Sequence, residues 1–151
     1  MIGVLSDTHG LLRPEALVAL RGSDLLIHAG DVGDPKVLDE LRRIAPVVAV
    51  RGNIDTGAWA MTLPEYEVVE REGVSIYVLH DVNQLDLDPV AAGLQAIVSG
   101  HSHKPAIRTL HGVLYLNPGS AGPRRFKLPV TVARLHLSAG KLTAEHVELV
   151  A

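Results

Sequence analysis

The fold is decided by the stretch MIGVLSDTHG at residues 1–10, where an apolar run ends in polar residues. A continuous apolar run of this length predicts a buried strand over residues 1–6. Asp7 and His9 come directly after that strand. Because open α/β sheets bind their ligands at the carboxyl ends of strands, these residues predict a parallel sheet with a polar site at its edge.

The residues that follow alternate between helix and strand patterns. Helices are expected at 14–21, where Pro14 suits a first helical position, and from Asp34 to residue 45, where apolar residues recur at helical spacing. Strands are expected at 24–28 and 47–50. Strand, helix and strand in succession predict parallel pairing through right-handed crossovers.

The second half of the chain is richer in strand patterns. A short helix is expected at 88–94, opened by Asp88 and Pro89. Strands, several of them antiparallel, are expected at 66–70, 74–79, 96–99, 106–110, 113–116, 130–137 and 142–149. The elements together predict an α/β fold in which two mixed sheets pack face to face, with helices on the outer faces.

Length and composition fit one domain over residues 1–151 and exclude several classes of protein. The net charge of −3 and the aromatic content of 3% give no strong nucleic-acid signal. The absence of cysteine excludes a thiolate metal site and a cysteine nucleophile. No apolar run reaches the roughly 18 residues of a membrane span, and no secretory signal is recognised, so a cytoplasmic location is expected.

Five polar motifs each come directly after a predicted strand. Since the strand ends can converge on one edge, we expect these motifs to meet in space. They bring two Asp, one Asn and four His residues. The motifs are Asp7-Thr8-His9, Gly30-Asp31, Gly52-Asn53, His80 and His101-Ser102-His103.

This mixture of imidazole and carboxylate side chains suits divalent transition metals such as Mn, Fe, Zn, Co and Ni. Seven ligands are too many for one tetrahedral ion, but they suffice for two ions if one carboxylate is shared. Two ions about 3.5–4 Å apart can hold a hydroxide nucleophile and stabilise an in-line displacement at phosphorus. The motifs therefore predict a dinuclear metal site for phosphoester hydrolysis.

The ordered motifs SDTHG at 6–10, GD at 30–31, GNID at 52–55, His80 and GHSH at 100–103 resemble those of the calcineurin-like metallophosphoesterases. NPGS at 117–120, followed by Pro123 and Arg124, is similar to the small YfcE-type phosphodiesterase branch. The resemblance implies a four-layer α/β/β/α sandwich and a metal-dependent phosphoesterase, with a phosphodiesterase as the first expectation. Its small members are often homodimers or homotetramers.

The resemblance also implies a role for each matching residue. Asp7, His9 and His103 would hold the first ion, and Asn53, His80 and His101 the second, with Asp31 as the bridge. The direct catalytic contributors would be Asp31, Asn53 and His101, around a bridging hydroxide. Asn53 and Arg124 would contact the small phosphodiester or phosphomonoester substrate. Mn²⁺ is the expected metal for both sites, with Ni²⁺, Zn²⁺, Fe²⁺, Co²⁺ and Mg²⁺ as alternatives.

Two positions depart from the family pattern. Many larger relatives have a histidine where this chain has Ile54, which cannot act as an acid or stabilise charge. This indicates slower turnover, or a leaving group that needs little protonation. Asp81 follows His80 where glycine is usual, and it could accept a hydrogen bond from a ligand histidine.

Other interpretations stay open beside the leading one. A non-catalytic scaffold is the main alternative, because a eukaryotic retromer subunit shares this fold and resembles the GHSH and NPGS motifs. A one-metal hydrolase is a third, although it leaves several of the seven groups without a role. His28 is interpreted as a hydrogen-bonded core histidine, Asp55 as a residue that could orient a ligand, and residues 117–120 as a structural loop.

Overall fold

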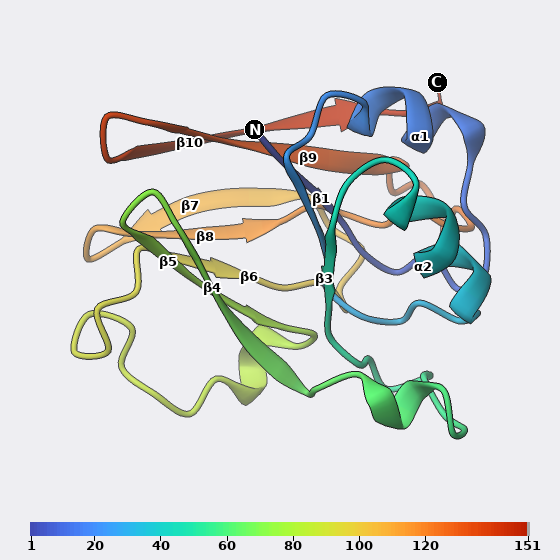
Figure 1. The fold of residues 1–151 in the computed structure, drawn as a ribbon, viewed down its shortest axis with the longest axis horizontal. Coiled ribbons are helices and arrows are strands. Elements are labelled where there is room, and N and C mark those ends of the chain that lie inside the picture. Colours follow the sequence, from blue (N-terminus) through green and yellow to red (C-terminus); the bar gives the residue numbers. More distant parts are fainter. Residues whose placement is uncertain (151) are drawn as a thin grey trace.

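The first sheet holds three parallel strands and two antiparallel ones. In this computed structural model, which describes residues 1–150, its strand order is β10-β9-β1-β2-β3 (Figure 1). Ala151, the last residue of the predicted domain, lies outside the described residues. The strands are β1 (Ile2–Leu5), β2 (Leu25–His28), β3 (Val47–Ala49), β9 (Thr131–Ser138) and β10 (Lys141–Glu148). The parallel pairing of β1 with β2 and of β2 with β3 confirms the crossovers predicted from the sequence.

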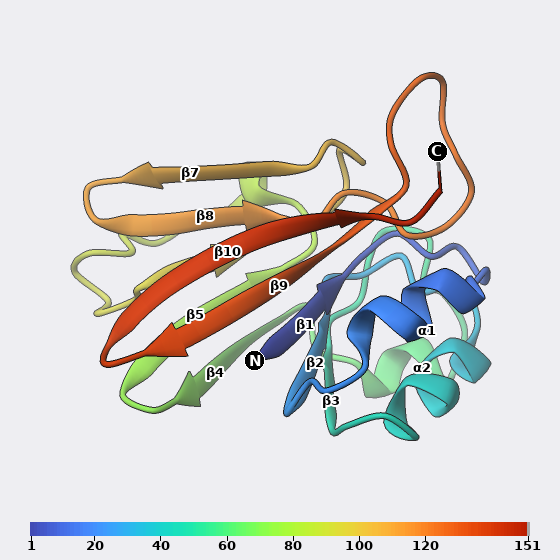
Figure 2. The ribbon, with the colours of Figure 1, turned by 90° about the horizontal axis from the view of Figure 1, so that it is seen from above.

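The helices α1 (Pro14–Leu20) and α2 (Pro35–Arg42) cover the outer face of this sheet (Figure 2). Asp34 caps α2 by accepting a hydrogen bond from the backbone N–H of Lys36 at 2.9 Å. Both helices bury apolar side chains against Leu5 and Leu26 of the sheet. None of the helices within residues 1–150 is long and apolar enough to cross a membrane.

The second sheet has the order β4-β5-β6-β8-β7. Its central strands β5, β6 and β8 run parallel, and hairpins add the two edge strands. The strands are β4 (Tyr66–Arg71), β5 (Val74–Leu79), β6 (Ala96–Val98), β7 (Ala106–Leu110) and β8 (Val113–Asn117).

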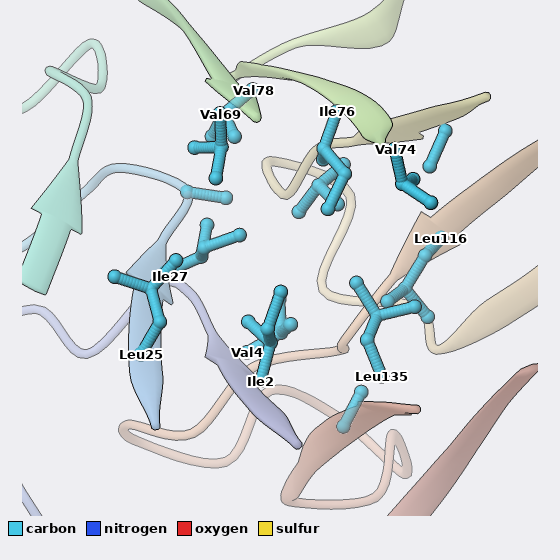
Figure 3. Close-up of a cluster of buried hydrophobic side chains, with 14 of the residues drawn as sticks. Ile2, Val4, Leu25, Ile27, Val69, Val74, Ile76, Val78, Leu116 and Leu135 are labelled. Atoms are coloured by element: carbon cyan, nitrogen blue, oxygen red, sulfur yellow. The ribbon is translucent and has the colours of Figure 1, made fainter. Parts of the chain in front are cut away.

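The hydrophobic core lies between the two sheets (Figure 3). Ile2 and Val4 of β1 point from the first sheet toward Ile76 and Val78 of β5 in the second. Because side chains alternate along a strand, Leu5 faces the helices instead. Burial on both faces explains why β1 and β2 are continuous apolar runs.

The outer layer of the second sheet differs from expectation in one element. The prediction of a helix at 88–94 was wrong, although the predicted sandwich is confirmed. Asp88 accepts from the backbone N–H of Val90 at 3.1 Å, but the structure continues only as turns. Gly93 has a φ of +75°, so the helix geometry ends before a second turn can form. The layer is completed by this segment and by the 3-10 helix η2 (Val82–Gln84), while another, η1 (Ala60–Thr62), precedes β4.

Gly3 is the point of closest approach between β1 and the helix layer. A Cβ atom at this position would lie 2.7 Å from the Cδ2 atoms of Leu20 and Leu26 and from the Oγ of Ser23. Distances this short require the neighbours to move, so the absence of a side chain is what lets α1 lie against the sheet.

We expect Gly3→Ala to lower the free energy of unfolding by about 1–3 kcal/mol through overpacking. A double-mutant cycle in urea with Leu20→Ala tests the cause, because removing the Leu20 methyl groups vacates one of the clashing positions. The loss caused by Gly3→Ala should then be smaller by about 0.5 kcal/mol or more. Equal losses in the two backgrounds would contradict the packing explanation.

Candidate metal centre

The carboxyl ends of β1, β2, β5 and β6 meet at one edge of the sandwich. In the first sheet the Asp7 N–H donates to Gly30 O at 3.0 Å, which joins the ends of β1 and β2. In the second sheet the Gly100 N–H donates to His80 O at 2.9 Å, which joins the ends of β5 and β6. A third bond joins the two sheets, since the backbone N–H of His101 donates to Asp7 Oδ2 at 3.1 Å. Six of the seven predicted ligands gather here as two three-residue groups.

The first group consists of Asp7, His9 and His103, whose ligand atoms all lie within 4.8 Å of one another. Asp7 and His103 are buried, and His9 is partly exposed. His103 Nε2 lies 3.5 Å from Asp7 Oδ1. One carboxylate and two imidazoles at this spacing suit a divalent transition metal.

The second group consists of Asp31, His80 and His101, again within 4.8 Å. Asp31 Oδ2 is 3.2 Å from His80 Nε2 and 3.5 Å from His9 Nε2 in the first group. The Asp31 carboxylate therefore lies between the two groups, where the sequence-based interpretation expected a bridge.

Asn53, the seventh predicted residue, follows β3 and is exposed. It lines a cleft of about 500 Å³ together with His80 and His101. Gly52 beside it passes directly against Asp31, because a Cβ at Gly52 would collide with the Asp31 backbone and carboxylate. Only glycine permits this approach of the β2 and β3 strand ends.

Several buried polar atoms in the two groups have no hydrogen-bond partner. They are Asp7 Oδ1, His9 Nε2, His80 Nε2 and His103 Nδ1. The contact between His80 Nε2 and Asp31 Oδ2 is close but lacks the alignment of a hydrogen bond. Buried polar atoms are nearly always satisfied, so lone pairs that converge without partners fit residues that coordinate cations.

The ring of His80 is oriented by the backbone. Its Nδ1–H donates to the carbonyl of Ala29 at 2.7 Å. This bond leaves the lone pair on Nε2, which faces both aspartates, at 3.2 Å from Asp31 and 3.9 Å from Asp7. Such a bond to the distal nitrogen is the usual way in which proteins fix a metal-binding histidine.

Five of the seven predicted ligand residues have left-handed backbone geometry. Their φ angles are 56° for Asp7, 47° for His9, 55° for Asp31, 71° for His101 and 63° for His103. Such conformations are uncommon outside glycine and cost about 1–2 kcal/mol each. Their concentration at one edge is typical of a functional site whose surroundings hold the strained backbone in place.

Burial and neighbouring charges set the protonation of the site. Burial raises the pKa of Asp7. Burial also acts to raise the pKa of Asp31, but contacts with His80 and the Ile54 N–H outweigh it, and the pKa falls below its ordinary value. For His80 burial acts to lower the pKa, whereas the Asp31 contact and the Ala29 bond raise it overall. A proton therefore competes with a cation for His80 Nε2.

The structure confirms the interpretation of His28 as a hydrogen-bonded core histidine. It is fully buried, its Nδ1 accepts from the Gly30 N–H at 3.1 Å, and its Nε2 is 3.0 Å from Thr8 Oγ1. The Thr8 hydroxyl donates to Val32 O at 2.8 Å, so the His28 Nε2–H donates to the hydroxyl oxygen. Burial lowers the pKa of His28 to about 3.

Asp55 joins the loops that follow β2 and β3. Its Oδ2 accepts from the N–H groups of Val32 at 3.1 Å and Gly52 at 2.9 Å, and its Oδ1 accepts from Gly33 at 2.9 Å. The residue is 3% exposed. Asp55 was expected to orient a metal-ligand side chain. It instead bonds to backbone N–H groups, and so it fixes the segments that carry Asp31 and Asn53.

The NPGS segment builds the loop against the first group, as the sequence predicted. Asn117 Nδ2 donates to Gly100 O at 2.9 Å and to Ser102 Oγ at 3.1 Å, which shapes the GHSH turn. Ser120 Oγ donates to Asp7 O at 3.1 Å. These bonds hold His101, His103 and Asp7 in their positions.

The remaining predicted residues are Arg124, Ile54 and Asp81. Arg124 is exposed in the loop before β9, and its Nη2 donates to Val150 O at 3.4 Å. Burial lowers the pKa of His103, and the positive charge of the neighbouring Arg125 contributes further. Ile54 is 39% exposed and donates its backbone N–H to Asp31 Oδ1. Asp81 Oδ2 lies 3.9 Å from His101 Nε2.

Sequence reasoning missed most residues of the cleft beside the second group. Tyr66 and Tyr77 belong to β4 and β5, whose patterns predicted only strands, and Arg51 lies in the loop after β3. No motif marks them. The one available signal was that β5 ends in His80, so outward-facing residues of β5 had to lie near the site.

Asp55→Asn should reduce the free energy of unfolding by about 3 kcal/mol, because an amide cannot accept all three backbone bonds and leaves a buried donor unsatisfied. Thermal and urea unfolding measure the loss. Asp34→Asn is the matched control: this partly exposed cap makes one bond, and Asn caps equally well, so a change of about 0.5 kcal/mol or less is expected. Equal losses in both variants would refute the role of Asp55.

The low pKa of His28 predicts a loss of stability in acid. Between about pH 6.5 and 3 the unfolded chain binds a proton that the folded chain excludes, so the contribution is complete above pH 6.5 and declines as the pH falls. At pH 4.5 the loss is about 3 kcal/mol. Urea unfolding in metal-free buffer measures the free energy of unfolding at pH 7.5 and at pH 4.5. The decrease between these two pH values should be smaller in His28→Gln than in the wild-type protein. If the free energy of unfolding falls equally with pH in the wild type and in His28→Gln, other groups cause the pH dependence.

Solved structures share this fold, among them a phosphodiesterase and a Vps29 protein. An archaeal phosphodiesterase matches with a TM-score of 0.80 at 21% identity, over 97% of this chain and 99% of that one. Vps29 from Chaetomium thermophilum matches with a TM-score of 0.78 at 18% identity, over 97% of this chain and 94% of that one. At these identities the two structures show a shared fold.

Sequence comparison goes further. A protein of Methanothermobacter thermautotrophicus named "Probable metallophosphoesterase" is 37% identical over 157 residues, which span 96% of this chain and 90% of that protein. The model of the calcineurin-like phosphoesterase superfamily domain matches residues 1–140. With the two His/Asp groups at the strand ends, these matches confirm the resemblance: the chain belongs to the calcineurin-like phosphoesterase superfamily.

Proposed function

We propose that this member of the superfamily is a metal-dependent phosphodiesterase with a centre for two divalent ions. One observation carries the proposal: two His/Asp groups share one edge of the sandwich, and buried ligand atoms in both lack hydrogen-bond partners. A purely structural cluster of this kind would leave those atoms unsatisfied at a free-energy cost.

The distances support an assignment of the histidines and aspartates. Asp7, His9 and His103 would hold one ion, and His80 and His101 would hold the other, with Asn53 proposed as a further ligand from the adjoining cleft. Asp31 reaches both, since its Oδ2 lies 3.2 Å from His80 Nε2 and 3.5 Å from His9 Nε2. The mixed imidazole and carboxylate set favours Mn²⁺ or a related transition ion.

When bound, a pair of divalent ions supplies an activated water nucleophile and neutralises the charge that develops on the phosphoryl oxygens. The chain supplies positioning. His80 is held by Ala29 O, Asp7 by the His101 N–H, and the Asp31 loop by Asp55. Asn53 is exposed at the mouth of the adjoining cleft, where its amide can bind a phosphoryl oxygen. Arg124, in the loop before β9, stays a proposed substrate contact.

A diester is the proposed substrate class, because the archaeal neighbour with this fold is a phosphodiesterase. Ile54 occupies the position at which larger relatives carry a histidine, so we expect slower turnover or a leaving group that needs little protonation. A homodimer or homotetramer remains the expectation from the family resemblance.

The scaffold alternative has one specific observation in its favour, which is the shared fold of Vps29. A scaffold has no need for seven ligand-type residues, strained backbone at five of them, and bonds that orient the rings. The ligand set therefore supports the enzyme. Metal analysis after dialysis, combined with turnover measurements, distinguishes the two.

We expect Asp31→Asn to reduce hydrolysis of bis(p-nitrophenyl) phosphate in Mn²⁺ buffer by at least about 100-fold, because the shared carboxylate is lost. Metal analysis should show that the stoichiometry of two ions per chain falls. The matched control is Asp34→Asn, three residues along the chain on a partly exposed helix cap, which should retain wild-type activity. Unchanged turnover in Asp31→Asn would contradict the bridging role.

A further inference from the structure

The cleft beside the second group has a chemistry that the metal ligands do not explain. It lies between the outward face of β4 and β5 and the segment that carries η2, and its volume is about 500 Å³. His80 and His101 line it. His80 is more than nine-tenths buried, and its Nε2 has no hydrogen-bond partner. The cleft is therefore continuous with the proposed reaction centre.

One wall of the cleft is aromatic. Tyr66 and Tyr77 stack with their ring centroids 5.7 Å apart and their planes at 18°. Tyr77 is buried, whereas Tyr66 is 60% exposed and presents ring surface to solvent. A tyrosine ring can stack on apolar groups, and its face attracts cations.

The charge of the cleft is negative. Among the lining residues of the described chain, Arg51 is the sole lysine or arginine, and it is already engaged. Its guanidinium makes an ion pair with Glu65 at 3.0 Å and donates to Leu63 O at 3.1 Å. Arg51 and Glu65 cancel, and the half-buried carboxylate of Asp81 and the exposed carboxylate of Asp86 leave an excess of negative charge.

Asp86 acts on the aromatic wall itself. Burial raises the pKa of the Tyr77 hydroxyl, and the negative charge of Asp86 raises it further. Asp81 is held in place, since its Oδ1 accepts from the backbone N–H of Asn83 at 3.0 Å. Both acidic groups thus belong to the segment that forms the wall of the cleft beside the tyrosines.

On the basis of the proposed function, we propose that this cleft binds the alcohol portion of the substrate and selects phosphoesters of cationic amino alcohols over phosphoesters of anionic alcohols. With the phosphoryl group at the ligand histidines, the alcohol extends along β5 toward the tyrosines. There a cation meets the Tyr66 ring and the Asp86 carboxylate, whereas a second anion meets uncompensated negative charge.

A matched set of three monoesters tests the selectivity without turnover. Isothermal titration calorimetry of the Mn²⁺-loaded protein at low ionic strength measures the affinity for phosphocholine, glycerol 3-phosphate and 3-phosphoglycerate. Affinity should fall in that order, with about tenfold between the first and the last. The ratio should shrink in 0.5 M salt, because the Debye length becomes shorter than the separation of the charges.

Asp86→Lys reverses one charge of the cleft and should reduce the ratio of phosphocholine to 3-phosphoglycerate affinity by about five- to tenfold. Glu70→Lys is the matched control, because this exposed residue lies on β4 with Tyr66 but about 13 Å further along the strand. It changes the net charge equally and should alter the ratio less than twofold. Tyr66→Leu should weaken phosphocholine by about threefold and leave glycerol 3-phosphate unchanged.

The outcomes separate this proposal from the proposed function. Hydrolysis of bis(p-nitrophenyl) phosphate with equal affinity for the three monoesters, or with no binding of any of them, would overturn the selectivity of the cleft while the phosphodiesterase stands. The predicted order of affinities without any hydrolysis would retain the cleft and overturn the enzyme. An equal effect of Asp86→Lys and Glu70→Lys would show that net charge, and not the cleft, discriminates.

Discussion

Hydrogen bonds between the sheets join the two halves of the site, and one of them links two ligand-type residues directly: the backbone N–H of His101, from the second sheet, donates to Asp7 Oδ2, from the first. Each sheet alone presents part of the ligand set at its strand ends. The bond is formed because the apolar core between the sheets aligns β1 with β5 and β6. The rigidity of that core is the constraint on which both metal-type groups depend.

The backbone of the site is strained, and hydrogen bonds from neighbouring loops keep it in this conformation. Asp7, Asp31 and His101 have positive φ angles, and the loops beside them are tied by Asp55, Asn117 and Ser120. These supporting groups are buried or bonded to backbone, so the ligand atoms stay close together although no mutual hydrogen bond satisfies all of them. Such preorganisation is what a metal centre needs, because ligands that must move before binding lose affinity.

Charge is distributed unevenly around the centre. Arg125, in the loop before β9, is near enough for its positive charge to lower the pKa of His103 in the first group, and Asp81 and Asp86 line the cleft beside the second. A phosphoryl group at the centre would have the Arg125 charge on the side of the first group and an acidic, aromatic cleft on the side of the second. In the proposed enzyme this asymmetry separates two tasks: the histidines and aspartates serve the chemistry, and the cleft serves the choice of alcohol.

Local patterns in the sequence predict where the ligand-type residues stand along the chain, because apolar runs and the polar residues that end them can be recognised without any long-range contact. The same patterns predict the sandwich, the parallel crossovers and the core role of His28. Which side chains face one another depends on the folded chain: Asp31 lies between the two groups, Asp55 bonds to three backbone amides, and Tyr66 and Asp86 share a cleft with His80. These contacts join segments far apart in sequence, so no local pattern predicts them. The missing helix at 88–94 has a local cause instead, because Gly93 has a φ of +75° and ends the helical geometry despite the capping bond of Asp88.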